Sequence, residues 1–128
     1  MRKLLPLLLA LLMLACNRTE HNSASDPAYA MLERVAELNA GGDKPGALAL
    51  ADSALLMHPA DTTRCWLLSE KAVTLVDMGR MADAVGVAQG AYRLAEKLHD
   101  VDAMLNLRGT MGIAYRRLGK TDSALVQY

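Results

Sequence analysis

The sequence predicts an all-α fold in which antiparallel helical hairpins are stacked side by side. The main observation is a Gly followed five residues later by an Ala, which occurs three times at intervals of 37 and 40 residues. A spacing of this kind is typical of repeat architectures. The apolar residues are mostly Ala, Leu, Val and Met, and Phe is absent, which favours closely packed helices over a sheet. The three pairs are Gly42/Ala47, Gly79/Ala84 and Gly119/Ala124.

Residues 1–15 have the pattern of an export signal. Arg2 and Lys3 precede an apolar run over residues 4–14, and Ala15 follows it. Eleven residues rise only about 16 Å as a helix, which is half of a hydrocarbon core and too short for a good membrane span. A basic start, a short apolar run and a small residue at its end are typical of a secretory signal peptide.

The stretch Leu-Met-Leu-Ala-Cys at residues 12–16 resembles the lipobox of bacterial lipoproteins, with Met13 where Leu is usual. The resemblance implies that Cys16 is lipidated and becomes the first mature residue, since two acyl chains suffice for stable anchoring. We therefore expect an exported protein anchored at the bacterial cell envelope, on the periplasmic side or at the outer membrane. An ordinary signal peptide with an incidental Cys is the alternative. Cys65 is then the only free thiol, and we expect it to be a small buried hydrophobe.

Polar residues over 16–26 predict a flexible tether that ends at Asp26, an N-cap, with Pro27 as the first helical residue. The first helix is predicted from about 27 to 38, and Gly42 follows its end. The second starts near Lys44 and stops before Pro59. The first helix carries apolar residues at helical spacing: Ala28, Met31, Leu32, Val35 and Leu38.

Three further helices and the start of a fourth are predicted after Pro59. The next runs from about Thr63 to Asp77, with N-cap candidates at residues 61–63. Another spans about 81–98, and a third is capped by residues 100–102 and reaches Leu118. A last helix begins near Asp122. The inward positions of the first two of these helices are Cys65, Leu68, Ala72, Leu75 and Val76, and Ala84, Val87, Ala88, Ala91 and Ala95. The apolar positions of the helix that reaches Leu118 include Leu105, Met111, Ile113 and Tyr115.

These hairpins resemble tetratricopeptide repeats over residues 27–128. The third copy is the clearest, since Met111, Gly112, Tyr115, Gly119, Ala124 and Tyr128 fill the family's small, turn and aromatic positions. Gly42, Ala47, Ala54 and Pro59 match in the first copy, and Ala72, Gly79, Ala84 and Ala91 in the second. The resemblance implies a right-handed solenoid of about 2.5 repeats, over 27–59, 62–98 and an incomplete 101–128. A generic alanine-rich helical bundle is the alternative.

The sequence contains no pattern that predicts catalysis. His21, His58 and His99 lie in three separate contexts, and no pair has metal-ligand spacing on a helix. No nucleophile motif and no glycine-rich phosphate loop is present, and no basic cluster suggests nucleic acid. We therefore expect no enzyme activity, no cofactor, no metal and no nucleic acid in this segment.

The resemblance implies a binding surface on the first helix of each hairpin. Carried over from the family, its positions are Tyr29, Leu32, Trp66, Ser69, Val73, Asn106, Ile113, Arg116 and Arg117. Trp66 is either an exposed interface anchor or packs against the first hairpin. Arg116 and Arg117 either meet an acidic peptide or form a solvated helix end.

Two functions are compatible with these observations. The first is a lipid-anchored scaffold that binds a protein or peptide at the cell envelope. The second is the extracytoplasmic input region of a sensor kinase or transcription regulator. Because the chain stops partway through the third copy, we expect a fragment of a longer protein, or an abnormally truncated reading frame, from which any output domain would be missing. Sequencing beyond codon 128 distinguishes the two hypotheses.

Overall fold

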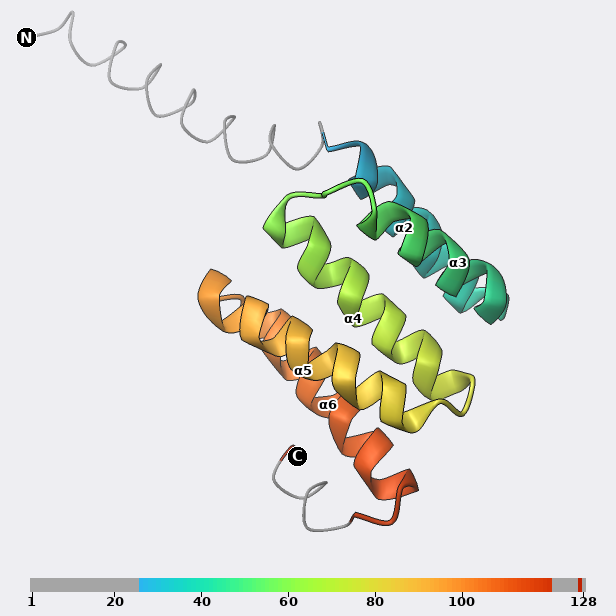
Figure 1. The fold of residues 1–128 in the computed structure, drawn as a ribbon, viewed down its shortest axis with the longest axis vertical. Helices are drawn as coiled ribbons and strands as arrows, with labels where there is room; N and C mark the ends of the chain where they lie inside the picture. The colour runs from blue at the N-terminus through green and yellow to red at the C-terminus, as the bar shows by residue number, and fades with distance from the viewer. Residues whose placement is uncertain (1–25, 121–126, 128) are drawn as a thin grey trace, which may run out of the picture.

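The computed structural model describes residues 26–120 and Gln127, and nearly all of this part is α-helical (Figure 1). Its helices are α2 (Pro27–Ala40), α3 (Lys44–Leu55), α4 (Asp61–Asp77), α5 (Met81–Leu98) and α6 (Val101–Arg117). No strand occurs among the described residues. The all-α prediction is confirmed, and the five helices lie within a few residues of the predicted ranges. The predicted signal peptide, Cys16, most of the tether and the helix near Asp122 lie outside the described residues.

The three repeated glycines end α2, α4 and α6 in the same way. Gly42, Gly79 and Gly119 have φ angles of 86°, 79° and 75°, in the left-handed region that L side chains rarely adopt. Each glycine N–H donates to the carbonyl three residues earlier, at 3.0–3.2 Å. The N–H of the residue after each glycine donates to the carbonyl five residues before it, at 2.8–2.9 Å. The repeated Gly therefore occupies the position directly after the C-cap (Gly41, Met78 or Leu118), where its left-handed conformation lets the chain reverse.

The helices form two layers. Each helix packs on the next, and α4 also contacts both α2 and α6, whereas α3 and α5 make no extensive contact among the described residues. Figure 1 shows α4 running between the α2–α3 pair and the α5–α6 pair. Since consecutive helices are antiparallel, α2, α4 and α6 point the same way and make one layer, and α3 and α5 make the other.

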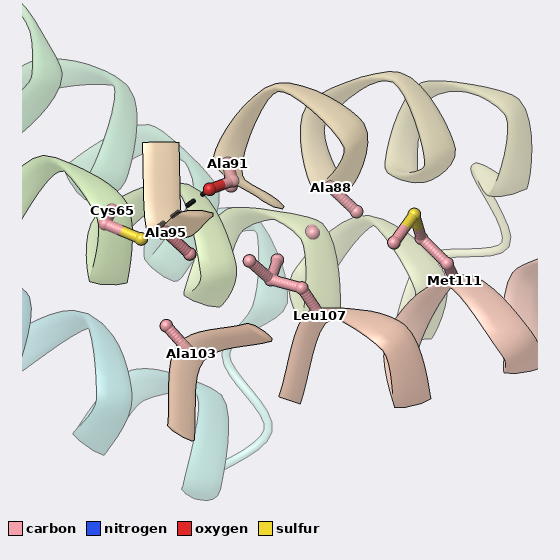
Figure 2. Packing of buried hydrophobic residues seen from close by; sticks show 8 residues of the cluster. Cys65, Ala88, Ala91, Ala95, Ala103, Leu107 and Met111 are labelled. Carbon is pink, nitrogen blue, oxygen red and sulfur yellow. Dashed lines mark hydrogen bonds between the residues drawn. The ribbon is translucent and has the colours of Figure 1, made fainter. Parts of the chain in front are cut away.

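Alanines on α3 and α5 let the two layers approach closely. Ala47, Ala51 and Ala54 on α3 are fully buried, and so are four alanines on α5. Ridges of small side chains permit short distances between helix axes. Figure 2 shows Ala88, Ala91 and Ala95 of α5 facing α4 and α6, across from Cys65, Leu107 and Met111. The α5 row consists of Ala84, Ala88, Ala91 and Ala95.

Cys65 is a buried hydrophobe, as the sequence predicted. Its side chain is fully buried on α4, and its thiol donates to the Ala91 carbonyl at 3.7 Å (Figure 2). Burial raises the pKa of the Cys65 thiol, and the negative charge of Asp100 acts in the same direction. The thiol therefore stays protonated and is a poor nucleophile.

Two local predictions are wrong. Helix α4 begins at Asp61 rather than Thr63, and its N-cap, Ala60, has no side-chain cap. The Ala60 N–H instead donates to Asp26 Oδ2 at 3.0 Å, while Oδ1 of the same carboxylate accepts from Ala28 N–H at 3.0 Å. A residue distant in sequence thus caps the start of α4. Leu105, an apolar residue of α6, is 63% exposed.

Polar side chains join the first hairpin to α4. Asn39 is nearly buried, and its Nδ2 donates to Glu70 Oε2 at 2.9 Å. The Asn39 Oδ1 accepts from the hydroxyl of the buried Thr74 at 2.8 Å. Lys44 Nζ donates to the Asn39 carbonyl at 2.8 Å and pairs with the Asp77 carboxylate at 2.9 Å. Because a buried amide needs its partners, these bonds fix the position of one hairpin against the other.

Candidate binding face

The layer formed by α2, α4 and α6 presents the face on which the sequence placed the binding residues. On α4, Trp66, Glu70 and Val73 recur at helical spacing and are half-buried, so they lie on one side of the helix. The neighbours α2 and α6 flank them, since both contact α4. We call this surface the α2–α4–α6 face. It also includes Tyr29, Leu32, Asn106, Ile113, Arg116 and Arg117.

Most of the predicted binding residues are accessible in part. Leu32, Val73 and Ile113 are half-buried, while Asn106 and Arg116 are exposed. Tyr29 and Arg117 are exposed as well. The layer therefore brings side chains that are far apart in the sequence onto adjacent, similarly directed helices.

Ser69 is the exception among these residues. It is 2% exposed, and its hydroxyl donates to the Cys65 carbonyl one turn earlier at 3.0 Å. Helix α4 lies between two neighbours in its layer, so it is covered on both sides, whereas a helix at the edge of the layer is not. The Ser69 side chain is thus unavailable to a partner.

Trp66 combines packing with exposure. It packs against the buried cluster shared by α4, α5 and α6, and not against the cluster of the first hairpin, which was the packing that the sequence suggested. The indole is only half-buried, so part of it stays accessible. Val73, about two helical turns after Trp66 on α4, packs against none of the three buried clusters of the described residues. Together they form an apolar centre on the face.

The charged side chains of the face are concentrated toward the C-terminus of α6. Arg116 and Arg117 occupy its last turn, where cations interact favourably with the helix dipole. An Nη of Arg117 donates to the Val76 carbonyl at 3.4 Å, near the C-terminus of α4. Glu70, the acid at the centre, is engaged by Asn39. The face thus offers apolar contact at its centre and positive charge at one end.

A hollow of about 420 Å³ lies on the other layer, between α3, α4 and α5. Its charged side chains are paired with each other: Lys71 with Asp52 at 2.6 Å, and Arg80 with Asp83 at 2.9 Å. Because these charges already have partners, they offer little attraction to a ligand. We therefore favour the α2–α4–α6 face.

A second hollow, of about 410 Å³, lies along α5 and α6 and was missed by sequence reasoning. Arg108 donates to the Tyr92 hydroxyl through Nε at 3.1 Å and Nη2 at 2.7 Å. The residues are 16 apart, and only the register between α5 and α6 brings them together. Gln127 also lines the hollow, so the hollow is formed in part by a residue that follows α6. Its other lining residues are Gln89, Arg93 and Met111.

The described part of the chain contains no group of three His, Cys, Asp or Glu residues able to hold a metal ion. None of the helices described is long and apolar enough to cross a bilayer. No family model matches the sequence, and no curated protein or solved structure matches it either. The interpretation of the face therefore rests on its geometry and on the residues that form it.

Proposed function

We propose that this protein is an exported, lipid-anchored repeat protein of the tetratricopeptide type, which binds a protein or peptide at the cell envelope. The observation that carries the proposal is the pair of accessible apolar side chains, Trp66 and Val73, on the central helix of a three-helix layer. Tryptophan in a partly desolvated position is a favoured anchor of interfaces.

The chemistry of the α2–α4–α6 face indicates what such a partner presents. An apolar side chain of the partner would lie over Trp66 and Val73, where contact removes apolar surface from water. An acidic group would lie toward Arg116, whose guanidinium is exposed and can bind a carboxylate through two hydrogen bonds. The partner is thus a peptide segment with an apolar anchor and an acidic residue beside it.

Two features support the repeat and anchor parts of the proposal. The identical glycine caps of α2, α4 and α6, together with the direct contacts of α4 with α2 and α6, are compatible with stacked hairpins of the tetratricopeptide type. The lipobox-like residues 12–16 would place two acyl chains on Cys16. The polar residues that follow would separate the domain from the membrane.

The binding proposal is tested by a photo-crosslinking amino acid at Val73 in the full chain expressed in bacteria. We expect a specific crosslinked protein band, which the charge reversal Arg116→Glu weakens. The matched control is the same amino acid at Ala82, an exposed position on the other layer. Equal crosslinking from positions 73 and 82 would contradict a binding role for the α2–α4–α6 face.

The anchor is tested separately by Cys16→Ser with labelled palmitate. We expect incorporation of the label into the original chain and none into the variant. Cys65 serves as an internal control, because it is fully buried. Unchanged labelling of the variant would rule out lipidation at Cys16.

A further inference from the structure

We infer that the end of the helical stack nearest the N-terminal segment lies against the surface of the bilayer that holds the anchor. This inference rests on the proposed lipidation of Cys16 and goes beyond it, because an anchored domain on a tether need not touch the membrane. It assigns a lipid surface as the partner of a defined group of side chains.

The first observation is the uneven distribution of large, exposed apolar side chains. Because consecutive helices are antiparallel, the first residues of α2, α4 and α6 and the last residues of α3 and α5 lie at one end (Figure 1). Leu56, the most exposed at 80%, lies there, and only Met78 and Leu118 lie at the opposite end. We call this group the proximal patch: Tyr29, Leu56, Met57, Val101 and Leu105.

The second observation is where the chain enters the domain. Residue 26 is the first described residue, and its carboxylate accepts hydrogen bonds from Ala28 N–H and Ala60 N–H at 3.0 Å each. These bonds fix the point of entry beside the α3–α4 link, which carries Leu56 and Met57. The chain therefore enters the domain beside Leu56 and Met57 of the proximal patch.

The third observation is the length of chain between the anchor and the domain. Ten residue steps separate Cys16 from Asp26, and ten extended residues span at most about 36 Å. With acyl chains on Cys16, the proximal patch can reach the interface, whereas Leu118 lies a helix length further away. Exposed Leu and Met at helix ends are suited to burial at the boundary between headgroups and acyl chains.

The charges around the patch indicate which kind of lipid surface it fits. Asp61 and Asp102 are exposed in the first turns of α4 and α6, and Asp100 lies between α5 and α6. Arg64 and Lys97 are the cations nearby. The acidic residues outnumber the basic ones, so attraction to anionic headgroups does not drive the contact. Apolar burial does, and a zwitterionic surface is therefore the better partner.

The test uses the acylated full chain in phosphatidylcholine vesicles that contain lipids with a spin label at the top of the acyl chain. Leu56→Cys carries an environment-sensitive fluorophore, and Leu118→Cys is the matched control at the opposite end. Cys65 does not compete for the label, because it is fully buried and burial raises the pKa of its thiol. We expect several-fold stronger quenching at position 56, and weaker quenching there when anionic lipid is added.

Flotation of the vesicles separates this inference from the anchor. If the protein floats with the vesicles but position 56 is quenched no more than position 118, the bilayer contact is refuted while lipidation stands. If the protein does not float, both proposals fail. Leu105→Cys gives a second probe on a different helix, so that a local disturbance of the α3–α4 link cannot decide the result. A label at 56 that is shielded in cells but unquenched in vesicles would indicate a protein partner and overturn the inference.

Discussion

The two complete hairpins, α2–α3 and α4–α5, share one local plan but differ in length. Both close their first helix with a glycine in the left-handed region, Gly42 or Gly79, and both bury a row of alanines on the second helix. The second helix of the first hairpin has 12 residues, whereas that of the second has 18 and carries one alanine more. The six added residues correspond to about 1.7 helical turns.

The helix after the longer hairpin starts with a local cap, Asp100, whose Oδ1 accepts from Ala103 N–H at 3.0 Å, whereas the start of the helix after the shorter hairpin is held by a distant residue. His99 ends α5 in the left-handed conformation, and the next N–H, of Asp100, donates to the Ala95 carbonyl at 3.0 Å. After α3, five residues lead to α4. The N–H of the last of them, Ala60, donates to the Asp26 carboxylate at the start of α2. The local sequence of a hairpin can therefore specify its turn, while the segment that leaves the hairpin is stabilised by a residue distant in the sequence.

The largest expected effect tests whether the alanine row of the second hairpin sets the close approach of the two layers. Ala84→Leu places extra methyl groups at a fully buried position and should destabilise the protein by roughly 1–3 kcal/mol. Ala82→Leu, on the exposed side of α5, is the matched control. Urea denaturation followed by circular dichroism measures both. Equal stability of the two variants would show that Ala84 is not at a close helix crossing.

The next effect tests the turn that both hairpins share. Gly79→Ala forces an L side chain to a φ of 79°, and should cost about 1–2 kcal/mol. Gly86→Ala is the control, because Gly86 lies inside α5 with open space where a Cβ would stand. That variant should gain about 0.5–1 kcal/mol. The same sign for both substitutions would contradict a conformational role for the repeated glycine.

A smaller effect concerns Asp26 and distinguishes the first hairpin from the second. Desolvation acts to raise the pKa of this carboxyl, but the N–H groups of Ala28 and Ala60 and the Thr63 hydroxyl together outweigh it, so the pKa lies below its ordinary value of 3.8. A folded-state pKa below the unfolded one stabilises the fold above about pH 4, and this contribution is lost as the pH falls through the folded-state pKa.

The corresponding variant is Asp26→Ala, compared with the original chain from pH 7 downward. We expect lower stability of the variant at neutral pH and a difference that shrinks below about pH 4. Asp102→Ala, an exposed acid in the first turn of α6, should show no comparable change. A difference that is constant over this range would mean that the charge of Asp26 does not contribute.

The smallest effect is a gain. His99→Gly removes an L side chain from a φ of 54° and should stabilise by up to about 1 kcal/mol, offset in part by the larger entropy of the unfolded chain. His58→Gly makes the same change at a φ of 51° in the exit of the first hairpin. Thermal melts compare the two. If His58→Gly stabilises the protein and His99→Gly does not, the local cap of α5 is not strained.

The sequence predicted the parts of the fold that depend on local chemistry. Gly42, Gly79 and Gly119 marked helix ends because few other residues adopt their conformation, and Asp26 with Pro27 marked the start of α2. The alanine spacing on α3 and α5 predicted which side of each helix is buried. These signals need no knowledge of neighbouring helices.

The missed features all depend on contacts between distant residues. Ala60 precedes α4 without a capping side chain of its own, and its N–H is instead satisfied by Asp26, which is 34 residues away in the sequence. Ser69 was placed on the binding face, yet it is covered because α4 is the central helix of its layer. Trp66 faces the α4–α5–α6 cluster, a choice that the spacing of residues along α4 does not determine. Whether the α2–α4–α6 face binds a partner stays a prediction.

The hydrogen bonds of Asn39 with Thr74 and Glu70 determine how the first hairpin is placed along α4. A slip of one helical turn, about 5.4 Å, would strand the Asn39 amide without its partners. These hydrogen bonds therefore hold the first hairpin and α4 in one fixed register. Under the proposed function, a peptide that spans Leu32 and Val73 would meet a constant separation between these side chains.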